Sequence, residues 1–193
     1  MAEDQIAMSY LRFASAREVF EAFPTAYEDI KAKPTEAPPL EFLHALASGP
    51  TPDDAIAFCA YVLSRREAVW WASQCVRALL DEPNAYDEAA LRAAENWVHE
   101  PDEPTRRTAL EVGMAADRKA ASTWVALAAA WSGGSLVFGE YPGPRAPPQL
   151  TARTARGAVL LALAGTPDRA AQVSRCVACG VRIAESSREP RDS

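Results

Sequence analysis

The 193-residue sequence lacks several features that mark large classes of protein. It contains only two histidines and four cysteines. No stretch of any length shows the apolar–polar alternation of a half-buried β-strand. Acidic residues outnumber basic ones, 26 to 20, and this balance argues against general nucleic-acid binding, which requires a cationic surface. We therefore expect a helical protein with no nucleic-acid partner.

Long apolar runs are also missing. The first ten residues, MAEDQIAMSY, begin acidic and predict no signal peptide. Residues 120–138 are uncharged, but they are rich in alanine, serine and glycine and too weakly apolar to predict a membrane span. Without an export signal, the four cysteines are expected to be reduced thiols. These absences favour a cytoplasmic protein.

What the chain does have is the composition of a globular protein, with 49% hydrophobic and 24% charged residues. The charges are unevenly spread. Residues 1–104 carry 19 acidic and 8 basic side chains, whereas residues 105–193 carry 7 and 12. Either the two halves attract each other or each faces a different partner, and we favour pairing within the chain.

Helix-start signals recur along the sequence. Ser64 with Glu67 has the pattern of a capping box, and Thr51 and Thr166 each precede a proline and an acid. Prolines and glycines fall between the apolar-periodic segments. The predicted helices cover residues 15–23, 25–30, 40–48, 51–63, 64–80, 84–99, 102–116, 121–132, 150–164 and 166–184.

These helices predict an all-α fold, either an irregular helical bundle or a short stack of helical hairpins. One long Gly/Pro-rich loop is expected over residues 132–149. We expect an irregular N-terminal segment with short helices over residues 1–39, a single all-α domain over 40–185 and a disordered tail over 186–193.

The helix predicted over residues 64–80 contains two adjacent tryptophans. Stepping 100° per residue places Trp71 on the apolar face. Trp70 falls instead on the polar face, with Arg66, Gln74 and Arg77, and Arg66 is placed for a cation–π contact with its ring. Trp70 is therefore a candidate anchor for a protein partner, with Arg66, Gln74 and Arg77 around it. Alternatively, the N-terminal segment folds back and covers the ring.

A second candidate site is the sequence Trp131, Ser132, Gly133, Gly134, Ser135. Backbone N–H groups around two adjacent glycines can bind an anion. No lysine follows and no strand precedes, so the segment is not a P-loop. A loop tethered by Trp131 is the favoured interpretation, and a ligand pocket lined by Trp131, the glycines and Tyr141 is the alternative.

Cys176 and Cys179 have the C-x-x-C spacing of metal and redox motifs. They lie inside a predicted helix, beside an apolar stripe, and a structural zinc site needs four ligands. Cys59 and Cys75 lie on other helices that are expected to be buried, so a four-cysteine site would need two distant pairs to converge. We favour small buried thiols with no metal, and no cofactor is expected.

Catalytic residues cannot be assigned. His99 follows Glu95 by four residues on a polar helix face, and His44 lies in a short helix with no evident partner. Spacing alone assembles no set of nucleophile, base and orienting acid.

Three short motifs stand out: REAVWWA at Arg66–Ala72, WSGGS at Trp131–Ser135 and, after a proline-rich loop, LTAR at Leu150–Arg153. With these motifs, residues 40–165 resemble a family of uncharacterised helical bacterial proteins. Some members of that family are encoded beside type VI secretion genes. The resemblance implies an accessory or adaptor role and transfers no catalytic residue.

The favoured functional hypothesis is a non-enzymatic helical interaction or adaptor protein, an accessory factor of a bacterial secretion system resembling type VI. The alternative is a small ligand-binding protein or enzyme with a pocket at the 131–141 loop. The protein partner, the substrate and the oligomeric state are not defined by the sequence.

Overall fold

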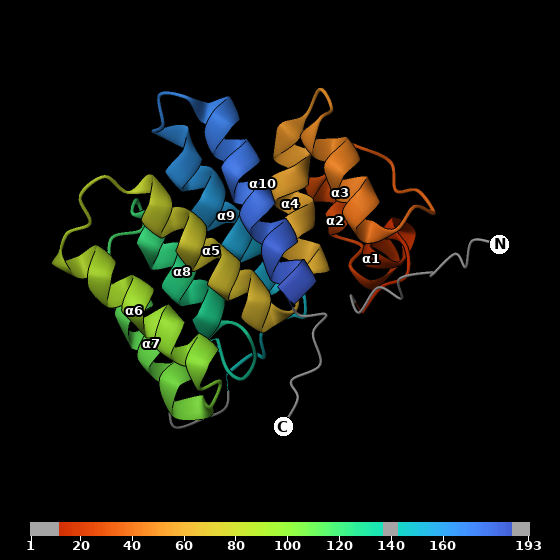
Figure 1. Cartoon of the computed structure of the whole chain (residues 1–193). Coiled ribbons are helices and arrows are strands. Elements are labelled where there is room, and N and C mark those ends of the chain that lie inside the picture. Colours follow the sequence, from red (N-terminus) through yellow and green to blue (C-terminus); the bar gives the residue numbers. More distant parts are fainter. Residues whose placement is uncertain (1–11, 137–142, 187–193) are drawn as a thin grey trace.

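The computed structural model describes residues 12–136 and 143–186 and confirms the all-α fold class. Within these residues the chain forms helices and one isolated β-bridge, between Ser135 and Arg145. The helices are α1 (Ala16–Ala22), α2 (Ala26–Asp29), α3 (Pro39–Ala47), α4 (Pro52–Val62), α5 (Arg65–Leu79), α6 (Ala85–His99), α7 (Glu103–Ala115), α8 (Ala121–Ala130), α9 (Leu150–Ala164) and α10 (Arg169–Ser186) (Figure 1).

The starts of α5 and α6 follow the local sequence signals. The predicted start at Thr166 was wrong: α10 starts at Arg169, and the Thr166 hydroxyl instead donates to the carbonyl of Leu163 at the end of α9. The Ser64 side chain accepts a hydrogen bond from the backbone N–H of Glu67, and the Glu67 carboxylate accepts one from the N–H of Ser64. Asn84 and Asp87 form the same reciprocal pair at the start of α6. The predicted capping box is therefore confirmed, and each box satisfies backbone donors that the first helical turn leaves unpaired.

Helix α8 lies at the centre of its neighbours, packed against α5, α6, α7 and α9 (Figure 1). Of its residues, only Trp124 is not buried. Gly113 of α7 allows close approach on one side, because a Cβ at that position would lie 2.8 Å from Leu127 Cδ2. Alanines on α8 and a glycine on α7 thus bring the two backbones together.

The N-terminal helices α1 to α3 pack against α4. The ring of Phe20 stacks on Phe58 with centroids 6.3 Å apart, and Phe42 meets Phe58 edge-on at 4.9 Å. These side chains belong to the same hydrophobic core as the later helices. Residues on both sides of the expected boundary at 39/40 therefore share one core. The expected tail beyond residue 186 lies outside the described residues.

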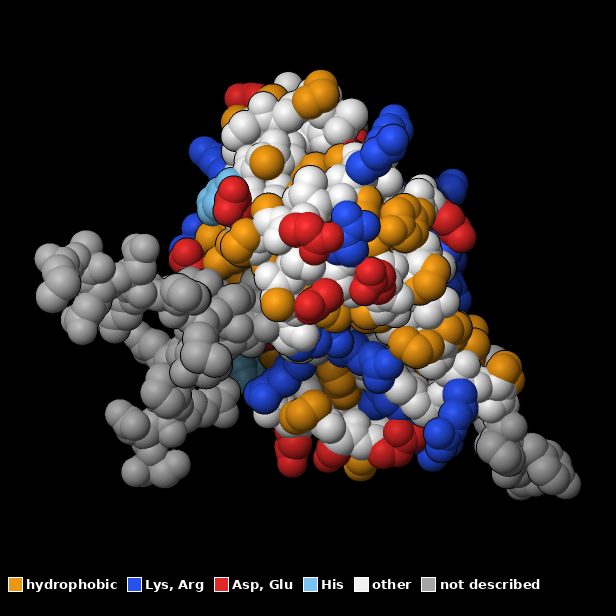
Figure 2. Space-filling model, turned by 90° about the vertical axis from the view of Figure 1, so that its right-hand side faces the viewer, with side chains coloured by type: hydrophobic (Ala, Val, Ile, Leu, Met, Phe, Trp, Pro, Cys, Tyr) orange, Lys and Arg blue, Asp and Glu red, His pale blue; other side chains and the backbone are white. Residues whose placement is uncertain are grey.

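Ion pairs join the acidic first half of the chain to the basic second half, as the charge distribution predicts. Arg169 pairs with Asp53 at 2.7 Å, and Arg153 pairs with both Glu28 and Asp29. Figure 2 shows the face of the molecule that includes the N-terminal helices, where acidic and basic side chains lie side by side. Pairing within the chain accounts for part of the opposed charges.

Among the described residues, no helix combines the length and apolarity that crossing a bilayer requires.

Candidate functional site

Trp70 lies on α5 and faces a shallow groove of about 440 Å³ between α5, α6 and the end of α10. The indole is partly buried, and it meets the His99 ring edge-on with centroids 5.8 Å apart. Val98 and Ile183 add apolar surface to the groove. Trp71, by contrast, is completely buried. The two adjacent tryptophans therefore point in different directions, as predicted.

The polar residues expected around Trp70 do not all lie beside it in the structure. Arg66 lines the same groove, but its Nε donates to the carbonyl oxygen of Val98 at 2.5 Å rather than lying over the indole. Arg77 binds the carboxylates of Glu88 and Glu95 on α6. Gln74 lines a different groove, toward α10. Of the four predicted residues, Trp70 and Arg66 share a surface and the others do not.

The Trp131–Ser135 segment brings carbonyl oxygens to arginines. Arg106, only 5% exposed, donates Nη1 to the carbonyls of Ala130 at 2.6 Å and Ser135 at 3.3 Å. Arg65 donates to the Ser132 carbonyl at 2.9 Å. These guanidinium groups satisfy orphan carbonyls at and just beyond the end of α8.

The two glycines of this segment differ in their surroundings. Gly134 has φ +63°, in the left-handed region, and a Cβ there would lie 2.9 Å from Arg106 Cζ. Glycine is therefore required both for the backbone conformation and for the close approach of the guanidinium. A Cβ on Gly133 would meet nothing within 4 Å. This geometry favours the tethered-loop interpretation over an anion site. Tyr141 lies outside the described residues.

Sequence reasoning missed Arg106, although a signal was present. Arg106 shares its face of α7 with Ala109, Leu110 and Gly113, all of which are buried. An arginine within an apolar stripe predicts a buried guanidinium with fixed partners, because an unpaired buried charge is strongly unfavourable.

Trp131 itself lines a groove of about 510 Å³ between α8 and α9. Trp124 lies at the same groove, where its Nε1 donates to the Arg118 carbonyl at 2.8 Å and the Arg118 guanidinium lies 5.9 Å from its ring. The Nε1 of Trp131 is buried and has no hydrogen-bond partner among the described residues. Arg153 also lines the groove, and its guanidinium pairs with Glu28 and Asp29.

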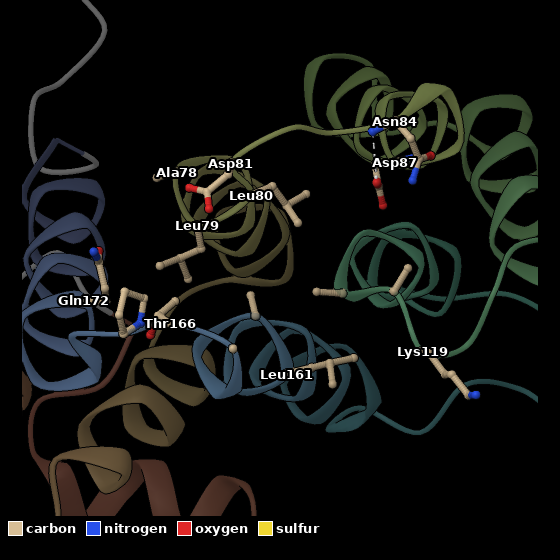
Figure 3. Close-up of a pocket in the computed structure, with 15 residues that line it drawn as sticks. Ala78, Leu79, Leu80, Asp81, Asn84, Asp87, Lys119, Leu161, Thr166 and Gln172 are labelled. Atoms are coloured by element: carbon tan, nitrogen blue, oxygen red, sulfur yellow. Dashed lines mark hydrogen bonds between the residues drawn. The ribbon is translucent and has the colours of Figure 1, made fainter.

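Another cavity, of about 500 Å³, lies where the end of α5 and the starts of α6 and α8 meet the α9–α10 turn (Figure 3). Its buried carboxylate, Asp87, accepts hydrogen bonds from the Asn84 backbone N–H at 3.1 Å and from the Ser122 hydroxyl at 2.5 Å. The bond from Ser122 joins α6 to α8. Asp81 and Lys119 bring opposite charges to the same cavity. Asp87 therefore serves to hold the two helices together.

The four cysteines converge, although they are far apart in the sequence. Cys59 on α4 and Cys176 on α10 are buried, Cys75 on α5 is also buried, and Cys179 is partly exposed. Cys75, Cys176 and Cys179 line one groove between α5 and α10, and the Cys75 sulfur lies 4.0 Å from the Cys176 carbonyl oxygen. All four are free thiols, and within the described ranges no three cysteine, histidine or carboxylate groups have the arrangement of a metal site.

The histidines occupy surface positions. His99 is exposed beside Trp70, and His44 is exposed on α3.

Together, these features define an all-α protein whose surface grooves contain partly buried tryptophans and a cluster of thiols. The chain belongs to a family of unknown function, DUF6931, whose model matches residues 42–184. The expectation of an uncharacterised family is confirmed to that extent. No curated protein and no solved structure matches the chain.

Proposed function

We propose that this protein is a non-enzymatic helical interaction protein that binds a protein partner at the Trp70 groove. The observation that supports the proposal is the partly exposed indole of Trp70, fixed against His99 in a groove that α5, α6 and α10 enclose. Aromatic side chains placed in this way are the usual anchors of protein interfaces, because they contribute a large contact area with little loss of conformational entropy.

The groove fits a partner segment that carries an apolar side chain beside an acidic one. Trp70, Val98 and Ile183 provide the apolar surface, and Arg66 and His99 provide the donors at its edge. The setting we propose is a bacterial secretion system resembling type VI, with the protein acting as a cytoplasmic accessory factor. That part of the proposal is supported by the motif resemblance at Arg66–Ala72 and Trp131–Ser135.

The test compares two aromatic positions. Trp70→Ala should weaken capture of the partner by about 2 kcal/mol or more, while shifting the thermal melt only slightly. Tyr86→Ala is the matched control, because Tyr86 is an 81% exposed aromatic on α6 that lies outside the groove. Affinity purification from a bacterium that encodes the protein, followed by titration calorimetry with the captured partner, provides both readouts. Equal capture by the Trp70→Ala variant would refute the proposal.

A second candidate function, binding of a small ligand, rests on the α8–α9 groove. The buried Nε1 of Trp131 has no acceptor among the described residues, and such donors are costly unless a ligand or water satisfies them. Two indoles with the Arg118 guanidinium fit a planar aromatic carboxylate.

A thermal-shift screen of aromatic carboxylates tests this second function. A hit should raise the melting temperature of the wild type and fail to do so for Trp131→Phe, which keeps a ring and lacks the donor. Trp124→Phe is the matched control, since the Trp124 donor already bonds to the Arg118 carbonyl. If no compound stabilises the wild type, ligand binding is rejected and protein interaction remains as the proposed function.

A further inference from the structure

We propose that Cys179 and Cys75 form a thiol redox pair, in which Cys179 reacts with a hydroperoxide and Cys75 then closes a disulfide between α10 and α5. The two residues are more than 100 positions apart in the sequence and meet only because α10 packs on α5. Neither the family description nor the proposed interaction function assigns them a role.

Access distinguishes Cys179 from the other thiols. Cys179 is partly exposed, whereas Cys59, Cys75 and Cys176 are at most 4% exposed. Cys179 opens onto a groove of about 380 Å³ between α5 and α10. Gln74, Arg175 and Arg182, whose side chains carry N–H donors, also line this groove. A small oxidant therefore reaches Cys179 before any other cysteine.

The surroundings of Cys179 also favour the reactive thiolate. The thiol of Cys75 and the nearby Arg182 guanidinium together lower the pKa of Cys179 to about 7. For Cys59, burial acts in the opposite direction and raises the pKa well above its ordinary value. The pKa of Cys176 is lowered too, chiefly by the Cys75 thiol, but Cys176 is buried. Because the thiolate is the nucleophile, the accessible Cys179 is the reactive cysteine of the cluster and Cys59 is inert.

Cys75 is the partner that the packing supplies. It lines the same groove as Cys179, and its sulfur lies 4.0 Å from the carbonyl oxygen of Cys176, one turn before Cys179 on α10. Cys75 is buried behind Cys179 at the same groove. It is therefore shielded from the oxidant and remains close to the sulfur that the oxidant modifies.

The chemistry balances in two steps. The Cys179 thiolate attacks the terminal oxygen of the hydroperoxide, an S–O bond forms, the O–O bond breaks, and the alcohol or water leaves after taking up a proton. The Cys75 sulfur then attacks the Cys179 sulfenic acid, forming the S–S bond and expelling water that carries the Cys75 proton. The two thiols lose two electrons in total, and the hydroperoxide gains them.

The first experiment needs no variant. The reduced full-length protein is treated with one equivalent of hydrogen peroxide, alkylated and mapped by mass spectrometry. The expected product contains a Cys75–Cys179 disulfide, and Cys59 remains a thiol that the alkylating reagent modifies. At pH 7, where roughly half of Cys179 is thiolate against about 3% of an ordinary cysteine, we expect oxidation to be roughly tenfold faster than that of a cysteine peptide. A Cys176–Cys179 link, a link between two chains or a rate equal to the peptide's would overturn the proposal.

Variants then separate the two roles. Cys75→Ala should trap Cys179 as a sulfenic acid that dimedone labels, whereas Cys179→Ser should abolish labelling at low peroxide. Arg182→Ala should shift the pH profile of Cys179 alkylation to higher pH. Arg175→Ala is the matched control from the same helix and groove, and it should leave the profile in place. An unchanged pH profile in Arg182→Ala would show that Arg182 does not activate Cys179. Circular dichroism confirms that each variant is folded.

Discussion

The buried indole of Trp71 donates a hydrogen bond of 2.9 Å to the backbone carbonyl of Cys176. The bond connects α5 to the middle of α10, across 105 positions of sequence. Trp71 is among the largest side chains that are fully buried. One residue thus combines a large buried apolar area with a polar contact that fixes the position of α10 along α5.

Replacing Trp71 should therefore be costly. Trp71→Ala is expected to lower the free energy of unfolding by about 3–5 kcal/mol, because it removes a large core side chain and leaves a cavity. Trp71→Phe should cost less, and its effect includes the lost hydrogen bond, about 1 kcal/mol. Chemical denaturation measures both. A Trp71→Ala loss below that of Trp70→Ala would contradict the assignment of the two faces.

Gly180 faces the same junction. A Cβ at Gly180 would lie 2.8 Å from Cys59 Sγ and 3.3 Å from Trp71 Nε1. Gly180→Ala should consequently destabilise the protein by about 1–3 kcal/mol through overpacking.

Gly157 offers a matched control, because it lies inside α9 and a Cβ there meets nothing within 4 Å. Gly157→Ala should stabilise the protein by about 0.5–1 kcal/mol, since glycine weakens a helix interior. We expect the two glycine-to-alanine substitutions to shift the denaturation midpoint in opposite directions. A stabilised Gly180→Ala variant would show that α10 does not pack this closely.

Local signals explain what the sequence predicts well. A helix start depends on residues within one turn, so the pairs Ser64 with Glu67 and Asp102 with Thr105 are evident in the amino-acid sequence itself. The 100° divergence of Trp70 and Trp71 is likewise a local property of a helix. Their different degrees of burial follow from the polar and apolar residues that each one shares a face with.

The remaining features depend on how helices pack, which single-sequence periodicity does not encode. The convergence of Cys59 with Cys176 requires the α4–α10 contact, which Gly180 permits. The predicted cation–π contact of Arg66 with the Trp70 ring was wrong for a related reason. The carbonyl of Val98, on a helix that starts later in the chain, offers a better partner than the adjacent indole.

The carboxylate of Asp29 anchors the N-terminal helices. It is 5% exposed, accepts a hydrogen bond of 2.6 Å from the Tyr61 hydroxyl and pairs with Arg153 and Arg156 on α9. Asp29→Asn should destabilise the protein by about 2–3 kcal/mol, because Arg156 loses its counter-charge at a largely buried position and Arg153 keeps only the exposed Glu28. Limited proteolysis should cut near residues 25–35 earlier than in the wild type. Glu28→Gln is the control, since its carboxylate is 64% exposed, and cleavage at the wild-type rate in Asp29→Asn would argue against the anchor.

The last prediction concerns acid stability. Burial opposes ionisation of Glu95, but hydrogen bonds from Arg77 and Ser73 prevail and lower its pKa below the ordinary value of 4.5. A carboxylate with a lowered folded-state pKa stabilises the protein above the unfolded-state pKa, and this stabilisation is lost as pH falls through the folded-state value. The difference in unfolding free energy between wild type and Glu95→Gln should therefore be full at pH 7 and shrink below about pH 4.5.

A double-mutant cycle with Arg77→Gln should give a coupling of about 1 kcal/mol at pH 7, modest because Arg77 is partly exposed. Denaturation across the pH range measures both quantities, and a coupling that persists undiminished at pH 2 would exclude ionised Glu95 as its source.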